Sequence, residues 1–321
     1  MSDRRQRVAE AALCHSVQQG LLHGHTIDDH PLAVYYDRGL LAHTAQHVAH
    51  VFAREVERGK NVKFLHCAAV KACPLSAVLR VIANESTAQS THGAECASVG
   101  EVAHALRHFA THAIVYDSPC KTTAELKYAL SAGVHVNIDS MQELARVEAL
   151  FCGWNGSTNQ GSTAACANPT PATVGLRINP IVGEGALSIF SVATLTSKFG
   201  IPITSITPTD IAARPWLTCL MVHTGSHGCG LSLLVEGVKR VVALAQAVND
   251  LTLRERGHKQ ITCIDIGGGV PAVMEWAEDY CAFAEYAAHL KRDVPLLFSG
   301  YFDKIITDFG ASMFARCGWV A

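Results

Sequence analysis

The residues whose types suggest chemistry lie at the ends of short apolar runs. Lys71 lies within the stretch 64–79, FLHCAAVKACPLSAVL, which is otherwise suited to burial. A lysine in a partly desolvated site is expected to have a lowered pKa, which frees its amine to condense with a carbonyl group. Gly267, Gly268 and Gly269 follow the strand-like ITCIDI. Consecutive glycines let backbone N–H groups approach an anion such as phosphate closely.

Two further residues suit a nitrogen-containing aromatic ring. Asp308 closes the strand-like KIITDF and could pair with a protonated pyridine nitrogen, and the flat side chain of His223 could stack on the ring. A carbonyl-reactive lysine, a phosphate turn and a partner for a pyridine nitrogen are what pyridoxal 5'-phosphate requires. We therefore expect this cofactor. We expect no metal, because the sequence between His223 and His227 is the turn-like TGS and the chain has no CxxC.

Short apolar runs alternate with amphipathic segments along most of the chain. The strand-like runs are 63–70, 94–98, 112–118, 135–140, 173–179, 219–226, 261–268 and 304–310. Strands that alternate with helices predict a parallel sheet with right-handed crossovers, and eight units over roughly 250 residues predict an α/β fold of the (β/α)8 TIM-barrel type. An open doubly wound sheet is the alternative, although no GxGxxG follows the first strand.

A barrel would bring the candidate residues together, because the chemistry of such folds lies at the C-terminal ends of the strands. Lys71, Glu95, Arg177, His223 and Asp308 all lie on or directly after predicted strands. Their joint placement indicates a functional site, since each residue alone would more often be an ordinary strand-end or packing residue.

Composition excludes several classes of protein. The chain has 321 residues, 49% hydrophobic and 17% charged, with a formal net charge of −2 and no dense Lys/Arg block, so we expect no nucleic-acid partner. It contains no uncharged apolar stretch of about 18 residues, so we expect no membrane span. Its 12 cysteines are scattered, several within apolar runs, which favours thiols in a reducing, cytoplasmic setting. The Arg-containing N-terminus is interpreted as a short amphipathic helix, with an organellar transit peptide as the alternative.

Seven short motifs, in order, carry a family resemblance. They are AVKACP (69–74), AECASVGE (94–101), INPIVG (178–183), SKFGIP (197–202), VHTGSHG (222–228), IDIGGG (264–269) and ITDFG (306–310). In these motifs the chain resembles the ornithine/diaminopimelate/arginine decarboxylase family of pyridoxal-phosphate enzymes with the alanine-racemase-like fold. The likeness runs from about residue 31 to 318 and is nearest to the diaminopimelate branch.

The resemblance implies a role for each matching position. Lys71 would form a Schiff base with the cofactor, His223 would stack on its ring, and Asp308 would hold the pyridine nitrogen. The phosphate would be bound by Ser226, Gly267, Gly268 and Gly269. Glu95 would lie near the lysine, and Arg177 would support the acidic network beneath the cofactor. The implied catalytic residues are Lys71, His223 and Glu95. The implied reaction is decarboxylation of a basic or diamino acid, as in lysine or polyamine metabolism.

The resemblance also implies a domain organisation. Residues 1–36 would belong to a second, β-rich domain, 37–310 would form the cofactor-binding barrel with a flexible insertion at 152–173, and 311–321 would begin the C-terminal part of the β-domain, which would be largely missing. The family implies a homodimer. Two departures stand out, since Asp308 replaces the family's glutamate and Ala311 its arginine. A non-catalytic barrel that binds the cofactor, or a regulatory homologue without turnover, is therefore the alternative function.

Overall fold

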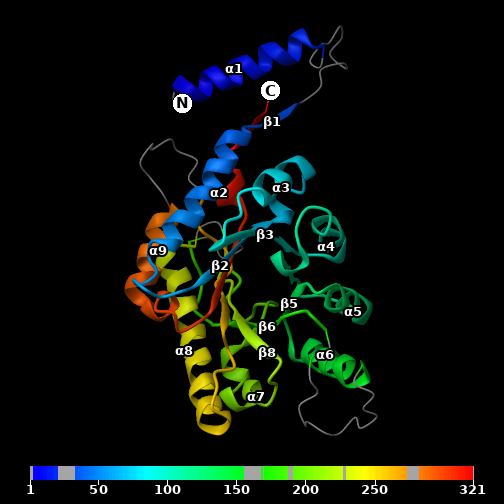
Figure 1. Ribbon diagram of the computed structural model, residues 1–321, viewed down its shortest axis with the longest axis vertical. Helices are drawn as coiled ribbons and strands as arrows, with labels where there is room; N and C mark the ends of the chain where they lie inside the picture. The colour runs from blue at the N-terminus through cyan, green and yellow to red at the C-terminus, as the bar shows by residue number, and fades with distance from the viewer. Residues whose placement is uncertain are drawn as a thin grey trace.

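The computed structural model describes residues 3–20, 33–154, 168, 170–186, 191–226, 229–272 and 282–320. Eight parallel strands form a closed barrel (Figure 1). They are β2 (Lys63–Ala69), β3 (Ser90–Cys96), β4 (Ile114–Asp117), β5 (His135–Ile138), β6 (Val174–Asn179), β8 (Leu217–Met221), β9 (Cys263–Asp265) and β10 (Lys304–Phe309). The ring closes because β10 pairs with β2 and β5 pairs with β6. The predicted (β/α)8 barrel is confirmed, and the open sheet is wrong.

Helices cover the outside of the barrel (Figure 1). They are α2 (Arg38–Ala53), α3 (Ser76–Ala83), α4 (Val99–Ala105), α5 (Thr123–Ala132), α6 (Met141–Trp154), α7 (Pro208–Ala212), α8 (Leu231–Arg256) and α9 (Ala282–Asp293). Local sequence fixes several of their ends. Thr122 and Glu125 form a reciprocal capping box at the start of α5, and Gly133 ends that helix at φ 81°, a conformation that favours glycine.

The strands are buried on both faces, as expected for a parallel sheet enclosed by helices. In β2 every residue after Lys63 is buried. Alternate side chains point into the barrel or out to the helix layer. The outward-facing His66 packs on Phe52 of α2 with 5.4 Å between ring centroids.

A small second sheet lies apart from the barrel. Strand β1 (Val34–Tyr36) pairs antiparallel with β11 (Gly318–Val320), so segments from the two ends of the chain lie side by side (Figure 1). The rings of Tyr35 and Trp319 stack across this pair at 5.5 Å. Helix α1 (Asp3–Gln18) precedes it, and the short α10 (Ala311–Phe314) leads from β10 to β11.

Some sequence-based boundaries differ from the observed ones. Strand β3 begins at Ser90, four residues before the predicted run, because Thr87 and Ser90 form a tight polar turn just ahead of it. The two-residue strand β7 (Ile201–Pro202), which adds to β6, was not predicted. Most of the predicted insertion at 152–173 lies outside the described residues.

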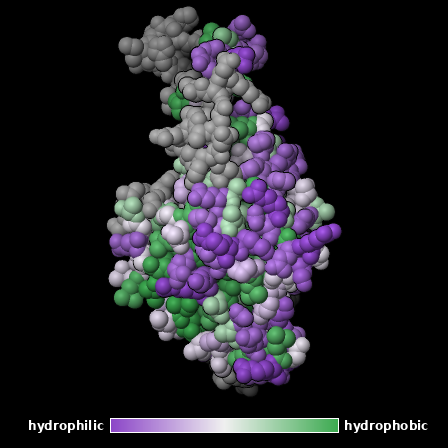
Figure 2. Space-filling view, turned by 90° about the vertical axis from the view of Figure 1, so that its left-hand side faces the viewer, coloured by the Kyte–Doolittle hydropathy of each residue, from purple (hydrophilic) through white to green (hydrophobic). Residues whose placement is uncertain are grey.

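No helix among the described residues has both the length and the apolar character needed to span a bilayer. The face drawn in Figure 2 carries mostly hydrophilic residues, with smaller hydrophobic areas between them.

Candidate functional site

A lysine and two carboxyl groups meet at the C-terminal ends of β2, β3 and β10. A short 3-10 helix, Val70–Ala72, follows β2 and carries Lys71. The Lys71 Nζ atom donates to Oε2 of Glu95 at 2.6 Å and lies 3.8 Å from Oδ2 of Asp308. Glu95 and Asp308 are 2% and 6% exposed, whereas half of the Lys71 side chain faces solvent. The Lys71 side chain is therefore accessible to solvent, while its amine contacts two buried carboxyl groups.

The expected lowering of the Lys71 pKa is wrong. Partial burial does act to lower this pKa, but the carboxyl groups of Asp308 and Glu95 outweigh it and raise the pKa of Lys71 above its ordinary value. The sequence showed an apolar run around Lys71, and the acids come from strands distant in sequence. The amine is protonated until a neighbouring group accepts its proton.

Glu95 is suited to accept that proton. Burial, reinforced by the nearby charge of Asp308, raises the pKa of Glu95 well above its usual range, although Lys71 opposes the shift. Burial also raises the pKa of Asp308. Two crowded carboxyl groups cannot both ionise freely, so the pair readily holds a proton close to the lysine amine.

The glycine turn directly follows β9. Gly267 and Gly269 have φ angles of 65° and 91°, which favour glycine. A Cβ atom at Gly268 would collide with the backbone oxygen of Asp308, and one at Gly269 with that of Gly225. The turn therefore needs all three glycines, because its backbone is pressed against neighbouring backbone.

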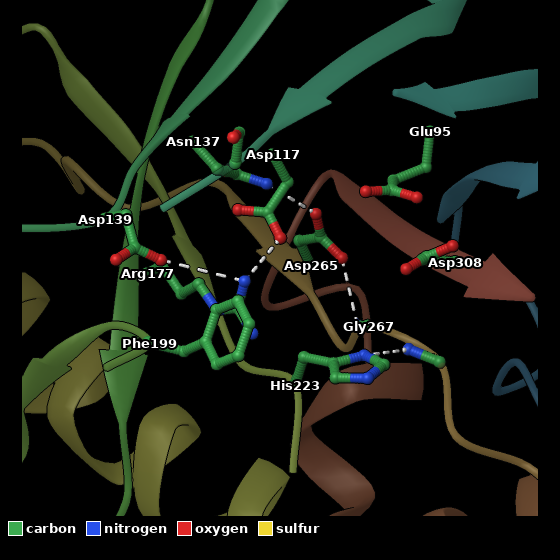
Figure 3. Close-up of polar contacts among 12 residues, drawn as sticks. Glu95, Asp117, Asn137, Asp139, Arg177, Phe199, His223, Asp265, Gly267 and Asp308 are labelled. Atoms are coloured by element: carbon green, nitrogen blue, oxygen red, sulfur yellow. Dashed lines mark hydrogen bonds and ion pairs between the residues drawn. The ribbon is translucent and has the colours of Figure 1, made fainter. Parts of the chain in front are cut away.

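Side chains hold the turn in place. The Gly267 N–H donates to Asp265 Oδ1 at 2.9 Å, and the Gly268 N–H donates to His223 Nδ1 at 3.0 Å (Figure 3). Burial, with Arg177 and Lys71 nearby, lowers the pKa of His223 well below its usual value. The His223 ring is therefore neutral, and because Nδ1 accepts a hydrogen bond its proton lies on Nε2.

Lys71 and the glycine turn lie at the same end of the barrel, and Asp308 connects them. Its carboxylate faces Lys71, its backbone N–H donates to Gly267 O at 2.8 Å, and its carbonyl packs against Gly268. A ligand bound between the lysine and the turn would thus pass over the Asp308 carboxyl group.

Arg177 lies in the floor of the site between two aspartates. Its Nη1 atom is 2.8 Å from Asp117 Oδ2 and 3.7 Å from Asp139 Oδ1 (Figure 3). Its guanidinium carbon lies 4.6 Å from the centre of the Phe199 ring. Burial raises the pKa of Asp139, and Arg177 opposes that shift. Arg177 thus lies between two acidic side chains, and its support of the site beneath the cofactor stays a prediction.

A second buried cation supports this floor and was missed in the sequence. Lys121 has no exposed side-chain surface, and its Nζ lies 2.9 Å from Glu143 Oε2. The same nitrogen donates to the carbonyls of Ser118 at 2.6 Å and Asn137 at 2.8 Å. Glu143 also accepts the N–H of Asp139 at 2.8 Å. Lys121 was missed because it lies in the polar loop CKTT, where lysine is normally solvated.

The remaining sequence expectations fall nearby or beyond the described residues. Ser226 follows Gly225, whose carbonyl lies against Gly269, so Ser226 lies near the turn. His227 lies outside the described residues. Cys67, Cys96, Cys219 and Cys263 are buried thiols, whereas Cys152 is disulfide-bonded, which the sequence did not suggest.

Several acceptors in the site have no protein partner within the described part of the chain. They are Glu95 Oε1, Asp117 Oδ1 and Asp308 Oδ1, all buried. Buried polar atoms normally have a hydrogen-bond partner, so the unpaired Asp308 Oδ1 atom suits a ligand that presents an N–H group. Together with a turn that has no room for side chains, this set fits a pyridoxal-type cofactor.

A family comparison agrees with this geometry. Residues 44–315 match the model described as "Pyridoxal-dependent decarboxylase, pyridoxal binding domain". The chain belongs to the pyridoxal-dependent decarboxylase family. The match includes each of the site residues described above.

Curated members of the pyridoxal-dependent decarboxylases share this part of the chain. A diaminopimelate decarboxylase of Pseudomonas fluorescens is 30% identical over 250 residues, which are 74% of this chain and 54% of that protein. One of Helicobacter pylori (strain J99) is 24% identical over 277 residues, covering 84% of this chain and 61% of that protein. The chain thus spans about 60% of the length of the curated relatives it matches.

Solved structures share the fold. Diaminopimelate decarboxylase from M. jannaschii in co-complex with L-lysine has a TM-score of 0.70 at 20% identity, covering 89% of this chain and 62% of that one. The biosynthetic arginine decarboxylase of Campylobacter jejuni has a TM-score of 0.66 at 16% identity, covering 97% of this chain and 49% of that one. At these identities the likeness concerns the barrel architecture alone.

Proposed function

We propose that the chain binds pyridoxal 5'-phosphate through Lys71 and forms the cofactor-binding part of an amino-acid decarboxylase that acts on a diamino or basic amino acid. The observation that carries the proposal is the arrangement around Asp308. The Lys71 amine lies 3.8 Å from Asp308 Oδ2, the glycine turn packs against the Asp308 backbone, and Asp308 Oδ1 is buried with no nitrogen or hydroxyl donor among the described residues. Few ligands other than a phosphorylated pyridine aldehyde would use all three features.

Each site residue has a role in this proposal. Lys71 supplies the amine, Asp308 holds the pyridine nitrogen, the neutral ring of His223 stacks on the cofactor, and Gly267–Gly269 with Ser226 accommodate the phosphoryl group. Bound pyridoxal phosphate supplies an electron sink that stabilises negative charge on the substrate carbon after CO₂ leaves. A neutral His223 suits this site because it adds no positive charge beside the ring.

Glu95 handles the proton of the lysine amine. It contacts Nζ at 2.6 Å, and its raised pKa makes it a better proton acceptor than an ordinary glutamate. Because only a neutral amine attacks a carbonyl, transfer from Nζ to Glu95 Oε2 prepares Lys71 for cofactor binding. Arg177, held by Asp117 and Asp139, supports the floor of the site.

Diaminopimelate is the proposed first substrate to test. The curated relatives that share this region are named diaminopimelate decarboxylase, and two of the structural neighbours are arginine decarboxylases. We further propose that residues 1–36 and 311–321 belong to a second, β-rich domain. The pairing of β1 with β11 away from the barrel supports that assignment. A homodimer is proposed from the family resemblance.

The test is CO₂ release from diaminopimelate, ornithine and arginine, with pyridoxal phosphate supplied. Release that disappears in Lys71→Ala supports the decarboxylase. A visible absorption band on cofactor addition that Lys71→Ala abolishes, without CO₂ from any of the three, would instead favour the non-catalytic binder, which the loss of the family's arginine at Ala311 makes a specific alternative. No cofactor binding at all would refute both.

A further inference from the structure

A row of hydrogen-bonded side chains runs through the barrel interior to the glycine turn. It begins at Thr173, whose Oγ1 lies 2.6 Å from Nδ1 of His135. His135 Nε2 lies 2.9 Å from Asn137 Oδ1, and Asn137 Nδ2 donates to Asp265 Oδ2 at 2.9 Å. Asp265 Oδ1 then accepts the N–H of Gly267 at 2.9 Å. The row connects β5 with β9, two strands that are not neighbours in the barrel.

The hydrogen-bond chemistry allows one arrangement of donors in this row. The Asn137 amide nitrogen donates to Asp265, so its oxygen must accept from His135 Nε2, and Nδ1 must accept from the hydroxyl of Thr173. Burial lowers the pKa of His135 to about 4, so the ring is neutral, as this arrangement requires. Burial raises the pKa of Asp265 to about 7, and the donors on Gly267 and Asn137 oppose that rise.

The barrel leaves space for Asn137. Its side chain is wholly buried, and a Cβ atom at Gly175 on the neighbouring β6 would collide with its amide oxygen. The view in Figure 3 shows the Asn137 amide directed toward Asp265, which in turn faces Gly267. Asn137 touches neither Lys71 nor the turn directly, so any influence on a ligand passes through Asp265.

We propose that Asn137 is a positioning residue for the glycine turn: it orients the Asp265 carboxylate that holds Gly267, and thereby sets the turn to accept a phosphoryl group. The inference rests on the proposed function in that the phosphoryl group belongs to the cofactor. Asn137 then contributes to the affinity for the cofactor only through the phosphoryl group, and not through the aldehyde or the ring.

That distinction separates positioning from ordinary structural support. Pyridoxal has the same ring and aldehyde as pyridoxal phosphate but lacks the phosphoryl group. If Asn137 acts through the turn, its loss weakens binding of the phosphorylated form and leaves pyridoxal nearly unaffected. If Asn137 merely supports the core, its loss weakens both by the same factor.

The experiment compares dissociation constants of both aldehydes for the full chain and for Asn137→Leu, measured by absorbance titration and by borohydride trapping with intact-mass readout. Asn249→Leu is the matched control. Asn249 is also wholly buried and makes three hydrogen bonds, to Gln260 and Ile261, before the start of β9. We expect the ratio of the two dissociation constants to shift about tenfold in Asn137→Leu, the lower end of the range for residues that support metal ligands, and to stay unchanged in Asn249→Leu.

An unchanged ratio in Asn137→Leu overturns the proposal, whether both affinities fall together or neither falls. A comparable shift in Asn249→Leu overturns it as well. If Asn137→Leu does not fold, the smaller Asn137→Ser, which also removes the amide, takes its place with the same expected direction. Failure of the proposed function is distinguishable, because the unaltered chain would then bind neither aldehyde at Lys71.

Discussion

Replacing Lys121 by methionine should destabilise the barrel by about 4 kcal/mol, because it removes one partner of a buried ion pair. Methionine fills nearly the same volume but donates no hydrogen bond. The change leaves the Glu143 carboxylate with only the partly exposed Arg146, 3.9 Å away, and removes the donor to the carbonyls of Ser118 and Asn137. Those contacts join the ends of β4 and β5, which carry the aspartates that hold Arg177.

The double variant Lys121→Met/Glu143→Gln separates charge from hydrogen bonding. Glutamine can still accept the Asp139 N–H that Glu143 accepts, but it leaves no buried charge. We expect this variant to recover about half of the loss, or about 2 kcal/mol, because an uncompensated buried charge accounts for much of such a penalty. Lys127→Met on the exposed side of α5 is the control, expected within about 0.5 kcal/mol of the unaltered chain.

Equilibrium urea unfolding, followed by circular dichroism and by tryptophan fluorescence, gives these free energies if both probes report the same transition. A cost below about 1 kcal/mol for Lys121→Met would refute the reasoning, since it would mean that water replaces the ammonium group. A double variant no more stable than Lys121→Met would show that the Glu143 charge is not the source of the penalty.

Three further predictions concern the turn, acid stability and the lysine. Gly268→Ala should abolish trapping of pyridoxal phosphate, because the new Cβ atom would collide with the Asp308 carbonyl. The control is Gly93→Ala, whose Cβ atom would collide with the Ala113 carbonyl away from the turn; it should cost about 1–3 kcal/mol of stability and leave trapping intact in the folded fraction. Equal loss of trapping in the two variants would contradict this. Burial lowers the pKa of His92 to about 4, below its value in the unfolded chain. The contribution of His92 to the free energy of unfolding is therefore complete above pH 6.5 and is lost as pH falls. Between pH 7 and pH 5, urea unfolding should show a decrease in this free energy that is about 2 kcal/mol larger for the unaltered chain than for His92→Gln, and equal decreases would refute the burial of His92 as the cause. Glu95→Gln should lower the pKa of Lys71, because a carboxylate that raises it is removed. The pH at which borohydride trapping reaches half its maximum should therefore fall, and an unchanged or higher midpoint would contradict the conclusion that Glu95 raises the pKa of Lys71.

The barrel was predictable because its signal is repetitive and local. Eight apolar runs separated by amphipathic segments identify parallel strands, and polar residues on or directly after these runs are then placed near the barrel mouth. Lys71, Glu95, Arg177, His223 and Asp308 were found in this way, and the structure brings them to one end.

Interactions between distant segments could not be read from the sequence. The pKa of Lys71 was predicted with the wrong sign, because the flanking residues are apolar and the acids that determine it lie 24 and 237 positions away in the chain. Lys121 appears in a polar loop and is nonetheless wholly buried. Asn137 could have been noticed, since His135, Asn137 and Asp139 alternate along one strand and so share its inward face.

Peptide mapping after borohydride reduction of the chain with pyridoxal phosphate shows which lysine holds the cofactor. We expect one modified peptide with the cofactor on Lys71, and loss of that product in Gly268→Ala. Attachment at Lys198 or another exposed lysine, with Lys71 unmodified, would contradict it.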